Sequence, residues 1–396
     1  MTRIVSRAWM CGVFVSAACA TAWAGAPASA EPEPPVPTPA PVAPGVRDVG
    51  DLLTPILAAR GVPAVGACLI VGDEVRMLGV AGVREKGGDV PVTADDLWHV
   101  GSCAKAMTAT LAAVLVERGV LTWDSTPPAV FPDLAEAMHE SWGRASLRLL
   151  LAHRAGAPIN ATRTRSQKLA TSGEPSHAQR RMLVEMVCAD ATLRPPGTRF
   201  EYSNVGYALA GAMCERAGGL PFEALIQREV FAPLGITSAG VGAPGVQGNV
   251  SQPRGHTDFG APVQPGAMGD NPAWMAPAGA LHMTLRDWAA FVALHLRGHP
   301  ENPNRAPRLL KPETFDMLLT SDVAEYALGW GLMQRPWAGG TVVTHSGSNT
   351  MWYCVVWMAP RKDFAVLACV NMGGPPGAQA ADDAVSALIR AHLEGQ

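Results

Sequence analysis

Segments typical of β-strands lie at both ends of this chain, and a mostly helical segment separates them. Near the start, "AVGACLIVG" and "EVRMLGVAG" predict two strands joined by a Gly72-Asp73 turn. Near the end, three more strands are predicted over "GTVVTHSG", "MWYCVVWMAP" and "FAVLACVNM". The simplest way to bury all of them is to pair the two ends of the chain. The sequence therefore predicts one antiparallel sheet built from N-terminal and C-terminal strands.

Apolar residues at helical spacing dominate the segment between these strands, as in "AMTATLAAVLVERG", "VGYALAGAMCERAGG" and "TLRDWAAFVALHLRG". Two more helices, "VRDVGDLLTPILAARG" and "AQAADDAVSALIRAHLEG", flank the strands at the two ends. The expected fold class is α+β, an α/β sandwich whose antiparallel sheet is flanked by helices and interrupted by an inserted, mostly α-helical domain. We expect the sheet part over about 46–110 and 325–396, and the helical part over about 111–324.

The first 30 residues, "MTRIVSRAWMCGVFVSAACATAWAGAPASA", have the pattern of a secretory signal peptide. Basic Arg3 and Arg7 precede an apolar stretch that ends at the small-residue site Ala28-Ser29-Ala30. We expect cleavage there and export to the periplasm or the medium, with no membrane span left afterwards. An uncleaved membrane anchor and a lipoprotein attached through Cys19 are the alternatives. Residues 31–45, "EPEPPVPTPAPVAPG", predict an extended proline-rich linker.

The formal net charge of -3 and the absence of any run of basic residues argue against nucleic acid or an anionic membrane surface as a partner. The cysteines that follow the signal peptide have irregular spacing, include no CxxC pair and lie mostly in apolar runs. Buried thiols are therefore expected, although an exported protein could form one or two disulfides. These cysteines are Cys68, Cys103, Cys188, Cys214, Cys354 and Cys369.

The stretch "GSCAKAMTATL" carries a serine and a lysine three residues apart at the start of a predicted helix. At this spacing, Ser102 and Lys105 share one helix face and can form a hydrogen bond. A neutral lysine could activate the hydroxyl, and the free N–H groups of the helix start could stabilise an oxyanion. Alternatively, Ser102 is only an N-cap and Lys105 a solvated residue of the first turn.

Two further motifs contain groups suited to the same chemistry. In "FEYSNVGY", Tyr202 could transfer a proton and Asn204 could hold a lysine or a substrate carbonyl, although Ser203 or Asn204 could simply cap a helix. In "VVTHSGSN", His345 precedes Gly347, which permits close backbone approach. The N–H of Ser348 could then face that of Ser102 as a second oxyanion donor. A histidine on a strand is otherwise a common structural residue.

In this order and at this spacing, the SxxK, YxN and HxG motifs resemble those of the serine β-lactamase and penicillin-binding-protein superfamily. Within it, the pattern is similar to the branch of class C β-lactamases, DD-peptidases and esterases. The segments "LLLAHRAGAP", "APAGALHMTLRDWAAF" and "YALGWGL" strengthen the resemblance, which extends from about Val46 to the end of the chain. No GxSxG motif is present, which argues against an α/β-hydrolase.

The resemblance implies a serine hydrolase that transfers an acyl group to water through a covalent serine ester, with no metal or organic cofactor. Ser102 is then the nucleophile and Lys105 its general base or a proton relay. Tyr202 protonates the leaving group and activates the deacylating water, while Asn204 orients the lysine and the substrate. The backbone N–H groups of Ser102 and Ser348 form the oxyanion hole. Cys103, beside the nucleophile, is expected to be a packing residue.

The third motif departs from class C β-lactamases, because His345 replaces the lysine whose cation helps to bind a substrate carboxylate. In the implied site, His345 completes the polar network beside Tyr202. The departure favours a small-molecule or peptide ester or amide, as for an esterase or D-peptidase. Class C-like β-lactamase activity and a non-catalytic binding or assembly relative are the alternatives. Specificity is expected to come from loops such as "GDNPAWMAPAG", with Asn271 and Trp274 as candidate cleft residues.

Overall fold

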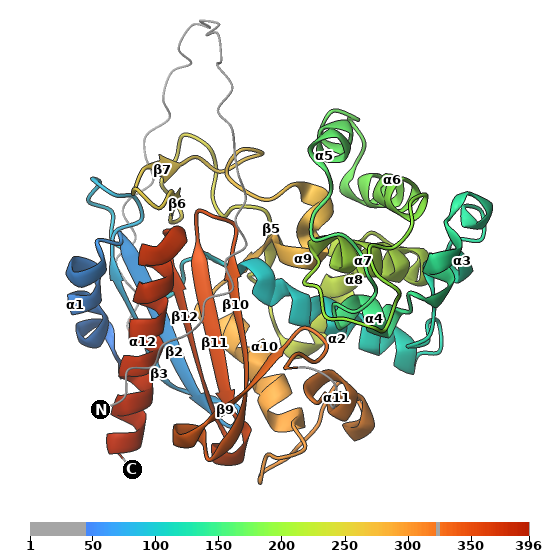
Figure 1. Cartoon of the computed structure of the whole chain (residues 1–396). Coiled ribbons are helices and arrows are strands. Elements are labelled where there is room, and N and C mark those ends of the chain that lie inside the picture. The colour runs from blue at the N-terminus through green and yellow to red at the C-terminus, as the bar shows by residue number, and fades with distance from the viewer. Residues whose placement is uncertain (1–44, 322–324, 396) are drawn as a thin grey trace, which may run out of the picture. The chain divides into compact units, whose positions relative to one another are not determined.

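The predicted pairing of the two chain ends is present in the computed structural model, which describes residues 45–321 and 325–395 (Figure 1). The main sheet has seven strands in the order β1-β3-β2-β12-β11-β10-β9, so that β2 from the N-terminal part pairs antiparallel with β12 from the C-terminal part. The predicted signal peptide and all of the linker except Gly45 lie outside the described residues. The strands are β1 (Arg47–Asp48), β2 (Ala64–Val71), β3 (Glu74–Gly82), β9 (Gly331–Arg335), β10 (Gly340–Ser348), β11 (Tyr353–Ala359) and β12 (Phe364–Val370).

The sheet confirms the predicted α+β class, with one exception to its antiparallel order. The two-residue strand β1 runs parallel to β3, pairing Arg47 with Met77. Two residues are too short a segment to show a period of alternation, so this strand could not be predicted.

Helices cover both faces of the sheet, which explains why its central strands are apolar at nearly every position. On one face, α1 (Gly50–Arg60) and α12 (Gly374–Glu394) pack over β2, β3, β11 and β12. Alternate residues of β2, including Val65 and Leu69, join the core beneath these two helices. The intervening Cys68 and Ile70 join the larger core on the opposite face.

The second face of the sheet is covered by α10 (Leu285–Gly298), which packs against β2 and β12. This helix belongs to the range 111–324 that the sequence assigned to the helical part. The chain therefore returns to the sheet before the helical segment ends, and the two parts share one continuous core.

The helical part is organised around α7 (Asn204–Gly218), which contacts α2 (Ala104–Glu117), α4 (Leu147–Leu151), α6 (Ser176–Cys188), α8 (Phe222–Ile226) and α9 (Ala276–Gly279). No helix within residues 45–321 and 325–395 combines the length and apolar character needed to cross a bilayer. The remaining helices are α3 (Pro127–Val130), α5 (Arg163–Ala170) and α11 (Pro312–Leu319), and the short strands are β4 (Trp98–His99), β5 (Gly240–Val241), β6 (Gly255–His256), β7 (Pro262–Val263) and β8 (Leu281–Met283).

All six cysteines in the described part of the chain are free and buried, as expected from the apolar runs that contain them. Cys103 packs beneath the sheet, where its Sγ lies 3.6 Å from Cys354 Sγ and 3.6 Å from the carbonyl oxygen of His345. It thus has the packing environment predicted for it.

A buried histidine on α10 predicts that the protein loses stability in acid. His295 is fully buried, lies 3.0 Å from Thr110 Oγ1 and contacts the rings of Phe291 and Trp330. Burial lowers its pKa from 6.5 to about 3. Between these two values the unfolded chain binds a proton that the folded chain does not, so the free energy of unfolding falls as the pH drops below 6.5. We expect a loss of about 2 kcal/mol from this group between pH 8 and pH 5.

Urea unfolding of the wild type and His295→Gln at these two pH values measures this loss. The variant should lose about 2 kcal/mol less than the wild type on acidification. His177→Gln, at an exposed histidine, should keep the wild-type pH dependence. An identical pH dependence in wild type and His295→Gln would contradict the assignment.

Candidate active site

Ser102 lies in a short 3-10 turn, Gly101–Cys103, that joins β4 to α2 and contacts β10. The N-cap residues of this turn and of α2, Val100 and Cys103, make no capping hydrogen bond with their side chains. The Ser102 hydroxyl oxygen instead lies 3.1 Å from Lys105 Nζ, one helical turn further along. The structure thus brings the SxxK pair together, and the alternative in which Ser102 is only an N-cap is wrong.

Lys105 is fully buried, so the alternative of a solvated lysine is also wrong. Its Nζ lies 2.8 Å from Asn204 Oδ1 and 2.6 Å from the carbonyl oxygen of Ala278 in α9. Both oxygens can only accept, so the amine directs two of its N–H bonds at them. In the neutral form, the nitrogen lone pair is then left for the Ser102 O–H. The geometry therefore allows Lys105 to take the hydroxyl proton.

The second motif is positioned by the start of α7. Ser203 is the N-cap, because its hydroxyl accepts the N–H of Gly206 at 2.7 Å. Asn204 is the first helical residue, and its amide connects Lys105 to Asn160, whose Oδ1 accepts from Asn204 Nδ2 at 2.9 Å. Capping by Ser203 leaves Asn204 free to hold the lysine.

Tyr202 contacts the lysine through its ring, whose centroid lies 4.8 Å from Lys105 Nζ. The ring of His153 lies on Tyr202 at a centroid distance of 4.3 Å, and its Nδ1 accepts the N–H of Ser203 at 3.0 Å. Burial lowers the pKa of His153 well below its ordinary value, and the electrostatic influence of Lys105 and His345 lowers it further. A neutral imidazole therefore supports the tyrosine. Sequence reasoning missed His153, although it lies in "LLLAHRAGAP".

The turn that carries Ser102 and the end of β10 approach each other so closely that only glycine fits at the contact. A Cβ at Gly347 would lie 2.7 Å from Ser102 N and would clash with the carbonyl oxygen of Val100. A Cβ at Gly101, whose φ is +45°, would clash with Ser348 N. The two backbone N–H groups predicted to form an oxyanion hole therefore belong to segments in direct contact.

His345 is nearly buried, with 8% of its surface exposed, and both of its ring nitrogens have partners. Nδ1 lies 2.6 Å from the carbonyl oxygen of Ser346 and therefore carries a proton, since that oxygen can only accept. Nε2 lies 3.0 Å from the hydroxyl of Tyr326, a residue that sequence reasoning did not single out within "YALGWGL". The ring of His153 contacts those of both Tyr326 and Tyr202, at 4.8 and 4.3 Å, and so connects the third motif to the second.

The two candidate cleft residues are placed differently from one another. Asn271 is half-buried and its Nδ2 donates to the carbonyl oxygen of Gly279 at 2.8 Å. Gly279 lies against Ser102, so Asn271 is joined to the wall of the site. Trp274 is 1% exposed and is part of the hydrophobic core, where it does not line an open cleft.

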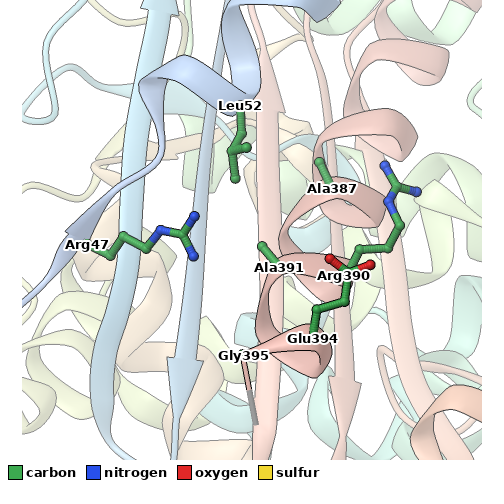
Figure 2. Close-up of a pocket in the computed structure, with 7 residues that line it drawn as sticks. All are labelled: Arg47, Leu52, Ala387, Arg390, Ala391, Glu394 and Gly395. Atoms are coloured by element: carbon green, nitrogen blue, oxygen red, sulfur yellow. The ribbon is translucent and has the colours of Figure 1, made fainter.

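A pocket of about 410 Å³ lies between α1, β1 and the end of α12, and none of the predicted site residues lines it (Figure 2). The residues that surround it are Arg47, Leu52, Ala387, Arg390, Ala391, Glu394 and Gly395. The described residues contain no group of three or more His, Cys, Asp or Glu side chains that could hold a metal ion.

Comparison with known proteins links this geometry to one family. Residues 49–391 match the family model described as Beta-lactamase. Penicillin-binding protein 4 of Amycolatopsis lactamdurans is 27% identical over 79% of this chain and 81% of its own length. A β-lactamase of Pseudomonas fluorescens is 24% identical over 85% of this chain and 88% of its own. The D-alanine carboxypeptidase AmpC of Burkholderia cenocepacia has a similar fold, with a TM-score of 0.66 and 21% identity over 85% of this chain and 98% of its own.

Proposed function

Since the chain belongs to the Beta-lactamase family, we propose that it is a serine hydrolase that cleaves an ester or amide through an acyl-serine intermediate. The observation that carries the proposal is the buried Lys105 amine, which lies between Asn204, Ala278 and the Ser102 hydroxyl. A buried lysine with two acceptors and an adjacent serine hydroxyl is the arrangement expected of a base and its nucleophile.

In the first half-reaction, Lys105 takes the hydroxyl proton as Ser102 Oγ attacks the substrate carbonyl carbon. The carbonyl oxygen becomes an oxyanion, which the N–H groups of Ser102 and Ser348 stabilise. The bond to the leaving group then breaks, and Tyr202 gives its hydroxyl proton to the leaving group and becomes a phenolate, while Lys105 keeps the proton taken from Ser102. In the second half-reaction, the Tyr202 phenolate accepts a proton from water as that water attacks the acyl-serine, and Lys105 returns its proton to Ser102 Oγ as the ester bond breaks.

We propose that an ester or peptide-like substrate is preferred to a β-lactam. The support is the environment of His345, whose Nδ1 faces a backbone carbonyl and whose Nε2 faces Tyr326. Both nitrogens are engaged within the protein, so this side chain offers a substrate carboxylate less than a lysine ammonium would. β-Lactamase activity is the second candidate, because a relative that matches most of this chain is a β-lactamase.

We also propose that the enzyme acts outside the cytoplasm on a small-molecule or peptide substrate. The support is the sequence of residues 1–30, which has the basic, apolar and small-residue regions of a signal peptide.

Mass spectrometry of the protein after mixing with a penicillin, a peptide ending in D-Ala-D-Ala or a short-chain p-nitrophenyl ester tests the proposal. We expect an acyl adduct on the peptide that contains Ser102, and fastest turnover of the ester. Turnover of the penicillin faster than the ester would instead support the β-lactamase candidate. Neither adduct nor turnover with any of the three would identify a non-catalytic relative and overturn the proposal.

A further inference from the structure

A buried carboxylate that belongs to none of the three motifs connects the two segments that contact each other beside Ser102. The side chain of Asp270 is 4% exposed. Its Oδ1 lies 2.9 Å from His99 Nε2 and accepts a hydrogen bond from Asn349 Nδ2 at 2.9 Å. His99 precedes the turn that carries Ser102, and Asn349 directly follows Ser348.

Asp270 contacts the turn that carries Ser102 through the imidazole of His99. His99 is buried, and its Nδ1 accepts the N–H of Gly101 at 3.1 Å. A nitrogen that accepts has no proton, so the ring proton is on Nε2, which makes a close electrostatic contact with Asp270 Oδ1 outside hydrogen-bond geometry. Gly101 has a φ of +45°, in the left-handed region. The Asp270–His99 contact thus supports the backbone conformation that places Ser102.

Asp270 contacts the turn between β10 and β11 through the side chain of Asn349. The Oδ1 of Asn349 accepts the N–H groups of Met351 and Trp352, each at 3.1 Å, while its Nδ2 donates to Asp270. The next residue, Thr350, has a φ of +75°. The Asn349 side chain therefore binds two backbone N–H groups of this turn and also connects the turn to the Asp270 carboxylate.

The contacts of Asp270 favour the ionised form of its carboxyl group. Burial acts to raise its pKa, but the contacts with His99 and Asn349 outweigh burial and lower the pKa below its ordinary value. The following residue, Asn271, bonds to Gly279 against the other side of the Ser102 turn. Asp270 therefore places a negative charge between the turn that carries Ser102 and the turn between β10 and β11.

We infer that Asp270 is a positioning residue of the oxyanion hole. One of its carboxylate oxygens connects two turns, of which one supplies the Ser102 N–H and the other supplies the Ser348 N–H. The inference rests on the proposed function, in which these two N–H groups bind the oxyanion of the transition state. Groups that act only on the transition state change kcat and leave KM nearly constant.

Steady-state kinetics with the ester substrate tests this role. We expect Asp270→Ala to lower kcat by about 10- to 100-fold and to change KM by less than about threefold. This decrease in kcat is smaller than the decrease of about 10²- to 10³-fold that follows complete removal of one oxyanion-hole donor. The affinity for an alkylboronic acid should fall by a similar factor, because its tetrahedral serine adduct places an oxygen in the oxyanion hole. Asp270→Asn, which keeps an acceptor for Asn349, should lie between Asp270→Ala and the wild type.

Asp363 provides a matched control, since its carboxylate contacts Arg297, Asn302 and Asn304 away from the site. Its φ of +51° is tolerated by asparagine. Asp363→Asn should lose stability but keep kcat within about twofold. Asn349→Ala removes the same connection without touching Asp270 and should reproduce the kinetic loss if Asp270→Ala does not fold.

The outcomes separate this inference from the proposed function. A wild-type protein that forms no adduct at Ser102 with a fluorophosphonate, and turns over no ester, would overturn the proposed function. An active wild type, with folded Asp270→Ala and Asn349→Ala that keep kcat and boronic acid affinity, would overturn the positioning role alone. A rise in KM at constant kcat would do the same, because it would place Asp270 in ground-state binding.

Discussion

Ser102→Ala is expected to lower ester turnover about 10⁶-fold, the scale measured for loss of a serine nucleophile. The reason is that, in the proposed reaction, the acyl group is bound to Ser102 Oγ, the atom that Lys105 Nζ approaches to 3.1 Å. The variant should also lose all labelling by a fluorophosphonate. Because removing this hydroxyl leaves the Lys105 contacts to Asn204 and Ala278 intact, the folded state should be retained. Initial rates and in-gel labelling measure both effects.

Ser146→Ala is the control for a serine whose role is purely structural. Ser146 is the N-cap of α4, where its hydroxyl accepts the N–H of Leu149 at 3.3 Å. Loss of this cap should cost about 1 kcal/mol of stability and leave labelling unchanged. If folded Ser102→Ala were labelled as strongly as the wild type, another residue would be the nucleophile.

Lys105→Met is expected to lower kcat about 10³- to 10⁴-fold, because the serine hydroxyl then has no base. Methionine has a similar length and no charge, so the variant avoids an unpaired buried cation. Lys105→Arg should be nearly as inactive, since a guanidinium cannot accept a proton in this pH range. Steady-state kinetics of both variants between pH 6 and pH 9 tests whether the base or the positive charge is required.

Thr108→Val is the matched control, because Thr108 lies one turn further along α2, is also fully buried and donates to the carbonyl oxygen of Pro277 at 2.7 Å. It should reduce stability and keep kcat within a few-fold of the wild type. Strong activity in Lys105→Arg would show that the lysine acts only as a cation.

The fold could be predicted because its sheet leaves a strong signal in the sequence. The stretches "AVGACLIVG" and "FAVLACVNM" are apolar throughout, since β2 and β12 are buried on both faces. The helical segment between them has a different period, so the two ends of the chain could be assigned to one sheet. The position of α10 could not be predicted, because its amphipathic pattern shows that one face is buried but not whether sheet or helix covers it.

The motif residues could be predicted because their spacing reflects one helix face, one helix start and one strand. Asp270, His99 and Tyr326 left no such signal, because each is a single polar residue whose partner lies far away in the sequence. The Asp270–His99 contact, for example, depends on how the 241–280 segment folds back onto the nucleophile turn. The burial of Trp274 could not be predicted either, since a tryptophan in a loop shows no periodicity that would reveal it.

The junction of β2 with β12 has a consequence for when the proposed site can first assemble. The N–H of Ala64 donates to Asn371 Oδ1, a residue 307 positions later, and the turn carrying Ser102 contacts β10, which is also made long after that turn. Contacts so distant in sequence form only after both segments have left the ribosome. A nascent chain therefore contains Ser102 long before the segment that supplies the Ser348 N–H has been made. The fold delays assembly of the proposed site until the strands as far as β12 have been synthesised.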